Sequence, residues 1–262
     1  MIDFSFSAFY NEKVQNHSAT GGNTMYPNCT IKAPFFEIGP KSYLYGDDIL
    51  DLALAIDAAA EKYDVDIIFT TPIVDIRRVK EATKRIHVFA PHMDALTPGR
   101  GLADILPESL KAAGAEGVML NHVEKQVTIA ELKARIQRAD EVGLATIVCA
   151  DSIAEASAIA HLNPNIIVAE PTELIGTGKA SDIEYVEASI HAVKDVNPDI
   201  LVLQGAGIKC YDDVYRNIFA GAEATGTSSG IVALPTREAR NAMVDEMIRA
   251  VREAWDARHA NK

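Results

Sequence analysis

The sequence predicts an α/β protein of the (β/α)8 barrel class, a single domain preceded by an N-terminal extension. Two observations support this prediction. From residue 33 onward, short apolar runs alternate with amphipathic helical stretches, and the alternation occurs eight times. The 262-residue chain also has the length for it, because a barrel of this class typically takes about 250 residues.

The eight strands are expected where apolar, often β-branched side chains dominate four or five consecutive positions. These runs are 35–38, 66–70, 87–89, 117–120, 145–148, 166–169, 200–203 and 224–227. The helices that follow them are expected at about 47–62, from 74, 107–113, 129–142, from 152, 182–196, 211–220 and 235–259.

Helix-capping residues mark the starts of two of these helices. Asp47 or Asp48 is the expected N-cap of the first helix. Thr128, with Glu131 three residues later, has the spacing of a capping box. The buried face of the first helix is expected to carry Leu50, Leu52, Leu54, Ile56 and Ala59.

The alternative α/β architecture is an open, doubly wound sheet with a glycine-rich nucleotide-binding turn after its first strand. Here that turn reads Gly39-Pro40-Lys41-Ser42 and lacks the GxGxxG pattern. The segment 205–207, Gly-Ala-Gly, also lacks the third glycine. The sequence therefore favours the barrel.

Residues 1–32 differ from the rest, and they form the predicted extension before a barrel domain at 33–262. They are rich in Ser, Asn, Thr and Gly and show no clear periodicity. We expect an irregular surface segment. The alternative is an arm that packs on a neighbouring subunit through Phe4, Phe6, Phe9 and Tyr10.

Composition excludes several classes of protein. The formal net charge of −12 argues against nucleic acid as a partner, because a nucleic-acid binder needs a basic face. No apolar run approaches the ~20 residues of a membrane span, and no secretion signal is recognisable. Three widely separated cysteines suit a reducing compartment. We therefore expect a cytoplasmic protein.

Ionisable residues gather where the strands end, which is where barrel enzymes place their chemistry. Lys41 follows the first strand, His122 and Glu124 follow the fourth, and Glu170 follows the sixth. Glycine-rich turns after the seventh and eighth strands can bind phosphate through backbone N–H groups. This set suits proton transfer on a small phosphorylated molecule, and it contains no cluster that would hold a metal ion.

At these same positions the chain resembles the triosephosphate isomerase family, which has the TIM barrel fold. Residues 170–178, Glu-Pro-Thr-Glu-Leu-Ile-Gly-Thr-Gly, resemble the family's catalytic glutamate and closing lid, closest to its compact archaeal-type branch. Residues 120–124 resemble its histidine segment, 41–44 its lysine segment and 205–208 its phosphate loop. The resemblance runs in order over about residues 35–255.

The resemblance implies a role for each side chain in interconverting glyceraldehyde 3-phosphate and dihydroxyacetone phosphate, a step of glycolysis and gluconeogenesis. Glu170 would be the base, and Lys41 would supply positive charge to the enediolate. Glu124 would orient Lys41 through an ion pair. His122 would be a neutral electrophile that polarises the substrate carbonyl group. This family is the established example of a histidine kept neutral for that purpose.

For the substrate phosphate, the resemblance implies backbone amides at Gly176, Gly207, Ser229 and Gly230. A lid over 171–180 would exclude water. No cofactor and no metal are implied. The family also implies association into a homodimer or homotetramer.

Two positions depart from the family pattern. Gly39 stands where the family has asparagine, and Val123 where it has serine. Two alternatives therefore stay open: an isomerase of the same mechanism acting on a related sugar phosphate such as a tetrulose phosphate, and a barrel that binds a phosphometabolite without turnover. His92 is interpreted as structural or interfacial, and Cys149 as a core residue of a strand.

Overall fold

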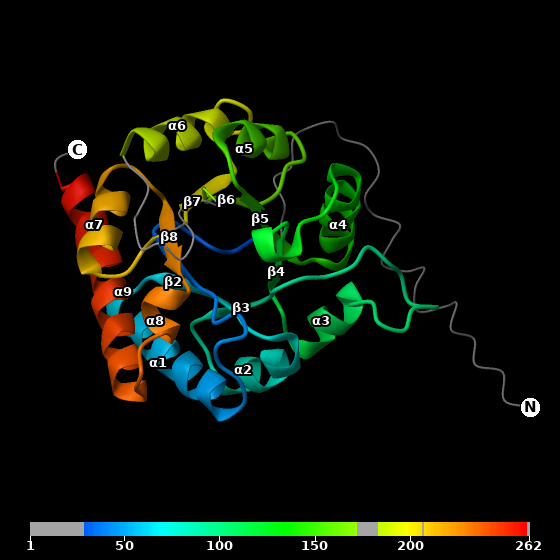
Figure 1. Ribbon diagram of the computed structural model, residues 1–262, viewed down its shortest axis with the longest axis horizontal. Coiled ribbons are helices and arrows are strands. Elements are labelled where there is room, and N and C mark those ends of the chain that lie inside the picture. The colour runs from blue at the N-terminus through cyan, green and yellow to red at the C-terminus, as the bar shows by residue number, and fades with distance from the viewer. Residues whose placement is uncertain (1–28, 172–182, 206, 261–262) are drawn as a thin grey trace, which may run out of the picture.

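The computed structural model describes residues 29–171, 183–205 and 207–260, and within them eight parallel strands close into a barrel (Figure 1). The strands are β1 Phe35–Ile38, β2 Asp66–Thr70, β3 His87–Ala90, β4 Gly117–Leu120, β5 Ala145–Ala150, β6 Ile166–Ala169, β7 Leu201–Gln204 and β8 Ala224–Thr227. Each strand pairs with the next, and β1 pairs with β8. The predicted (β/α)8 barrel is confirmed.

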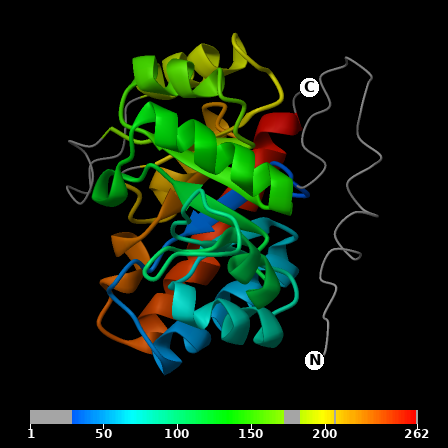
Figure 2. The same ribbon diagram turned by 90° about the vertical axis from the view of Figure 1, so that its right-hand side faces the viewer.

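Helices surround this barrel and, apart from α8, follow the order that the sequence predicts. They are α1 Asp47–Tyr63, α2 Ile76–Ala82, α3 Pro107–Ala113, α4 Ile129–Val142, α5 Ile153–Ala160, α6 Ile183–Lys194, α7 Tyr211–Phe219, α8 Ser229–Val232 and α9 Arg237–His259. Two 3-10 turns, η1 Ile73–Asp75 and η2 Val123–Lys125, lie between them. The helices α1 and α9, which come from opposite ends of the barrel sequence, lie side by side in both views (Figures 1 and 2). Together with the β1–β8 pairing, this contact closes the fold.

The N-cap of helix α1 lies one residue before Asp47, the first of the two expected caps. Gly46 is the N-cap, with φ 61°, and both Asp47 and Asp48 lie in the first turn. The prediction that one of them is the N-cap is therefore wrong. Their charge still stabilises the helix, because carboxylates in the first turn face the positive end of the helix dipole.

The buried face of α1 also differs from the expected one. The buried residues are Ile49, Leu52, Ala53, Ile56, Ala59 and Ala60. Leu54 is 43% exposed, and Leu50 is half-buried. The sequence 49–56 is apolar on nearly every side, so its pattern alone could not distinguish the core-facing stripe from its neighbours.

Other boundaries shift by a few residues. The capping box is confirmed, because the side chains of Thr128 and Glu131 each accept from the other's backbone N–H. The strand expected at 145–148 continues to Ala150. The last helix begins at Arg237, capped by Thr236, and the short helix α8 before it is not predicted by the sequence.

The core has two layers because alternate residues of each barrel strand point inward and outward. The inner layer includes Phe35, Ile68, Phe89, Ile147 and Ile166, and the outer layer packs the strands against the helices. Ile31, from the predicted extension, also joins the inner layer. Toward the carboxyl ends of the strands, the inward positions become polar or small, and the packed interior opens into a cavity.

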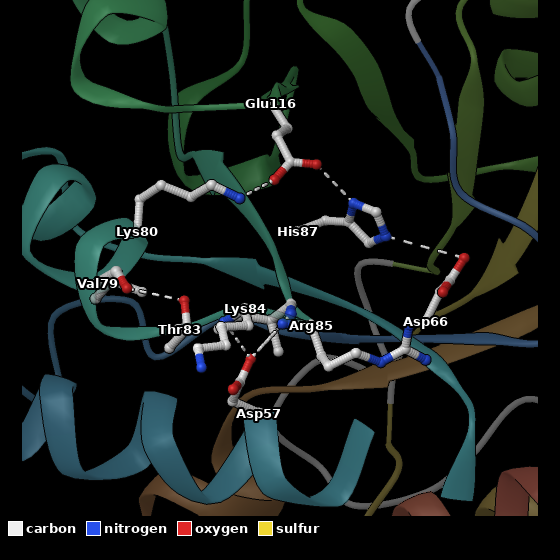
Figure 3. A network of polar contacts seen from close by, with 10 residues as sticks. Asp57, Asp66, Val79, Lys80, Thr83, Lys84, Arg85, His87 and Glu116 are labelled. Carbon is white, nitrogen blue, oxygen red and sulfur yellow. Dashed lines mark hydrogen bonds and ion pairs between the residues drawn. The ribbon is translucent and has the colours of Figure 1, made fainter. Parts of the chain in front are cut away.

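The amino end of the barrel is held by an ion-pair network (Figure 3). His87 opens β3, and its Nδ1 lies 2.7 Å from Oε2 of Glu116, while its Nε2 lies 3.9 Å from Oδ2 of Asp66. Lys80 pairs with the other oxygen of Glu116 at 2.5 Å. Burial by itself lowers the pKa of His87, but the two carboxylates outweigh it and raise that pKa to about 9. We conclude that His87 is protonated at neutral pH.

No helix in the described ranges has both the length and the apolar character that crossing a bilayer requires.

Candidate active site

A cavity of about 600 Å³ opens at the carboxyl ends of the strands. The sequence-predicted residues Lys41, His122, Glu124 and Glu170 all line it, although they follow three different strands. Gly207 and Ser229, from the turns after β7 and β8, line it as well. The barrel therefore brings together residues that lie up to 188 positions apart, from Lys41 to Ser229.

Glu170 and His122 face each other within this cavity. Strand β6 ends at Ala169, so Glu170 is the first residue beyond it. Its Oε2 lies 4.0 Å from Nε2 of His122, and the two side chains are only 18% and 13% exposed. A carboxylate and an imidazole at this separation can act on two neighbouring atoms of one small molecule.

The environment of His122 determines its protonation. The residue caps the turn η2, and its Nδ1 accepts a hydrogen bond of 3.1 Å from the backbone N–H of Glu124. Burial and the nearby charge of Lys41 lower the pKa of His122, against an opposing effect of Glu124. The ring is therefore neutral at pH 7 and carries its hydrogen on Nε2, the nitrogen that faces Glu170.

Lys41 reaches the cavity from an unusual backbone conformation. Its φ of 50° lies in the left-handed region, which a residue with a side chain adopts at a cost of about 1–3 kcal/mol. Its Nζ forms an ion pair with Oε1 of Glu124 at 3.2 Å. The ammonium group is therefore held at the mouth of the cavity, close to the segment that carries His122.

Asn121 anchors that segment from below. Its Nδ2 donates to the carbonyl of Cys149 at 3.0 Å and to Oε1 of Glu155 at 3.2 Å, and its Oδ1 accepts from the N–H of Val127. Asn121 is buried and has a φ of 58°. This side chain joins the end of β4 to β5 and to the segment that follows η2, so it sets the position from which His122 enters the cavity.

The turns after β7 and β8 are fastened to each other. Thr227 Oγ1 donates to the carbonyl of Ile208 at 2.7 Å, and a Cβ on Gly230 would lie 2.5 Å from that same oxygen. Gly207 has a φ of 72°, which favours glycine. Ser229 and Gly230 open α8, where the first N–H groups of a helix have no intrahelical partner. Gly176 and the rest of 172–182 lie outside the described residues.

Glu37 and Thr70 are polar residues of the cavity that the sequence analysis missed. Glu37, on β1, is buried in the cavity floor, and Thr70 Oγ1 on β2 donates to its Oε1 at 2.6 Å. The only signal was a single glutamate within the apolar run of 35–38. Since both faces of a barrel strand are buried, that run did not reveal which face carried the charge.

His92 and Cys149 also line the cavity. His92 is buried, with Nε2 lying 3.4 Å from Oδ1 of Asp94, and Asp94 pairs with Arg135. This network fits the structural interpretation of His92. Cys149 is a buried residue of β5, as expected. Among residues 29–171, 183–205 and 207–260, no group of three or more acidic, histidine or cysteine side chains could hold a metal ion.

Comparisons with known proteins agree with this geometry. The family model described as triosephosphate isomerase matches residues 40–238. The triosephosphate isomerase of Methanobacterium bryantii is 37% identical over 206 residues, 77% of this chain and 91% of the relative. That of Sulfurisphaera tokodaii is 35% identical over 212 residues, 79% of this chain and 92% of the relative. That of Methanosarcina mazei is 33% identical over 224 residues, 84% of this chain and 99% of the relative.

The barrel, the cavity at its carboxyl end and the collinear similarity over most of the chain lead to one assignment. The archaeal relatives match the resemblance to the archaeal-type branch that the lid motif suggested. The chain belongs to the triosephosphate isomerase family, and it is an enzyme of the isomerase class.

Proposed function

We propose that this isomerase interconverts glyceraldehyde 3-phosphate and dihydroxyacetone phosphate without a cofactor or metal. The observation that carries the proposal is the pair of Glu170 and His122, a carboxylate and a neutral imidazole 4.0 Å apart in one cavity. The reaction moves a proton between adjacent carbons and another between their oxygens. One group must act on the carbons and a separate group on the oxygens, and these two residues supply both.

In this mechanism Glu170 removes the proton from the carbon next to the carbonyl. The Nε2–H of His122 donates to the carbonyl oxygen, since Nδ1 is already engaged with the N–H of Glu124. An enediolate results, and Glu170 returns the proton to the neighbouring carbon. A positioned base of this kind contributes a factor of about 10²–10⁴ to the rate.

Lys41 stabilises the negative charge of the enediolate, and its ion pair with Glu124 keeps the ammonium group directed at the cavity. The backbone amides of Gly207, Ser229 and Gly230 bind the phosphate, together with that of Gly176 in the lid. Closure of the lid over 171–180 excludes water and so limits loss of phosphate from the enediolate.

A second candidate is an isomerase of the same mechanism that acts on a longer sugar phosphate, such as a tetrulose phosphate. Gly39 favours it, because the site lacks the asparagine side chain that other members of the family place there. The third candidate, a binding protein without turnover, has no use for the base and the electrophile together.

We further propose that the protein is cytoplasmic, works in glycolysis and gluconeogenesis, and binds neither nucleic acid nor membranes. Residues 33–262 would form the catalytic domain and 1–32 an extension. We also propose a homodimer or homotetramer.

A coupled assay with glyceraldehyde 3-phosphate and dihydroxyacetone phosphate tests the proposal. We expect a kcat/KM near ~10⁷–10⁸ M⁻¹s⁻¹. Glu170→Gln should lower kcat by at least ~10²-fold, since the amide cannot take a proton. The control is Glu187→Gln on the exposed face of α6, which should leave the rate unchanged.

Activity several orders of magnitude lower, but still lost in Glu170→Gln, would favour the longer sugar phosphate. No turnover of any sugar phosphate would leave only the binding protein.

A further inference from the structure

The carboxyl group of Glu37 lies in the floor of the cavity, and the proposed mechanism gives it no task. Glu37 points into the barrel from β1, on the same face as Phe35, and is only 8% exposed. A carboxyl group buried this far from water requires hydrogen-bond partners.

Only one of its two oxygens has a partner among the described residues. Oε1 accepts from Thr70 Oγ1 at 2.6 Å, and within residues 29–171, 183–205 and 207–260 the carboxyl group forms no other hydrogen bond or ion pair. Oε2 of Glu37 has no hydrogen-bond partner among the described residues, yet it is not fully buried by protein atoms. It therefore lies at the surface of the cavity that Glu37 lines. Thr70 therefore holds one oxygen and leaves the other available to a molecule in the cavity.

Glycines beside the carboxyl group give it this space. A Cβ at Gly39 would lie 3.1 Å from Oε1 of Glu37, and a Cβ at Gly226 would lie 3.2 Å from Oε2. The space beside Gly39, which has no side chain, therefore borders the carboxyl group of Glu37.

The charged neighbours of Glu37 are Lys41 and Glu170. Burial raises the pKa of Glu37 to about 7, with Glu170 adding to the rise and with Thr70 and Lys41 opposing it. Near neutral pH the group is therefore present both as the acid and as the carboxylate. Either form can hydrogen-bond a hydroxyl group, the first as donor and the second as acceptor.

We propose that Glu37 is a specificity-determining residue that hydrogen-bonds the C3 hydroxyl group of a four-carbon sugar phosphate, so that the site accepts tetrose phosphates as well as triose phosphates. The inference rests on the proposed isomerase function. In that function His122 and Lys41 take the oxygens on C1 and C2, and the backbone amides take the phosphate. A triose phosphate has no further hydroxyl group, because its C3 carries the phosphate, whereas a tetrose 4-phosphate has one on C3.

Binding of two polyol phosphates that cannot isomerise tests the inference without turnover. Isothermal titration would compare erythritol 4-phosphate with glycerol 3-phosphate on the full chain. We expect the wild type to bind erythritol 4-phosphate at least as tightly as glycerol 3-phosphate. In Glu37→Leu its affinity should fall at least tenfold more than that of glycerol 3-phosphate, because the apolar side chain cannot bond the hydroxyl group.

Glu37→Gln is the second variant, since it keeps the shape and an oxygen for Thr70. It should retain part of the preference that Glu37→Leu loses. Glu187→Gln, on the exposed face of α6, is the matched control and should change neither affinity. The inference would be overturned if both variants lost affinity equally for the two ligands, or if neither variant lost affinity. A wild type that binds only glycerol 3-phosphate would overturn it as well.

The corresponding kinetic comparison separates this inference from the proposed function. Glyceraldehyde 3-phosphate and erythrose 4-phosphate would be followed by proton NMR. Isomerisation of neither compound by the wild type would contradict the proposed function, while the titration would still decide the role of Glu37. Isomerisation of both compounds, with Glu37→Leu selectively slower on erythrose 4-phosphate, would support both.

Discussion

The backbone N–H of Glu124 donates to Nδ1 of His122 over 3.1 Å, and this one bond selects the ring nitrogen that carries the hydrogen. A neutral imidazole has one N–H, so an accepting Nδ1 requires the hydrogen on Nε2. Nε2 lies 4.0 Å from the carboxylate of Glu170. The turn η2 therefore orients His122, which we propose as the electrophile, through the main chain, independently of which side chain stands at position 123.

We predict that nitrogen NMR of His122 shows the Nε2–H tautomer at pH 7. Protonation should occur only below the ordinary histidine pKa, since burial and Lys41 both lower the pKa of His122. The variant Lys41→Met should move that pKa upward, because it removes the positive charge but keeps most of the side-chain volume. A protonated Nδ1 at pH 7 would contradict the assigned hydrogen bond.

The variant Gly205→Ala should lower kcat at least ~10²-fold while the protein remains folded. A Cβ at this position would lie 2.9 Å from Cβ of Glu170, so Glu170, the base that we propose, must move. Small displacements of a catalytic group cost about this much. Steady-state kinetics and circular dichroism measure the two effects. Gly101→Ala is the control, because its Cβ would meet the side chains of Asp104 and Leu96 on an exposed loop. Equal activity of both variants would show that Glu170 tolerates the displacement.

Glu37 should make the free energy of unfolding fall as the pH rises. Its pKa is about 7 in the folded protein and 4.5 without the fold, so between these values the folded state binds more protons than the unfolded state. The shift corresponds to roughly 3 kcal/mol, lost between about pH 4.5 and 7. Denaturant unfolding at pH 5 and pH 8 should therefore show Glu37→Gln gaining stability relative to the wild type at the higher pH. A pH-independent difference between the two proteins would refute the assigned burial.

His87 should stabilise the fold in a different pH range. Because its pKa is about 9 in the folded protein against 6.5 without the fold, its contribution is complete below about pH 6.5 and disappears as the pH rises through 9. The shift corresponds to about 3 kcal/mol. His87→Gln should therefore cost most stability near pH 6 and little above pH 10, measured by urea unfolding. Exposed His161→Gln is the control and should cost little at either pH.

The succession of strands and helices could be predicted from the sequence because each strand and each helix has a local physical signal. The eight apolar runs are short and separated by amphipathic stretches, and parallel strands with such crossovers have few ways to bury both sheet faces. Glu170, His122 and Lys41 were identifiable for a related reason. Each lies within three residues of the end of a strand, and the strand ends of a barrel meet at one rim.

Tertiary structure alone decided the details that depend on distant contacts. Nothing local distinguished Leu54 from Ala53, because the packing of α1 against α9, α2 and β2 determines which of its apolar residues are buried. Glu37 was ambiguous for the same reason. The surroundings of this glutamate come from Thr70 on the next strand and from Gly39 and Gly226. Of these three residues, Thr70 and Gly226 are 33 or more positions away in the sequence. Sequence determines which groups are available, while closure of the barrel determines which of them share a cavity, since the charges and hydrogen bonds that act there come from side chains of different strands.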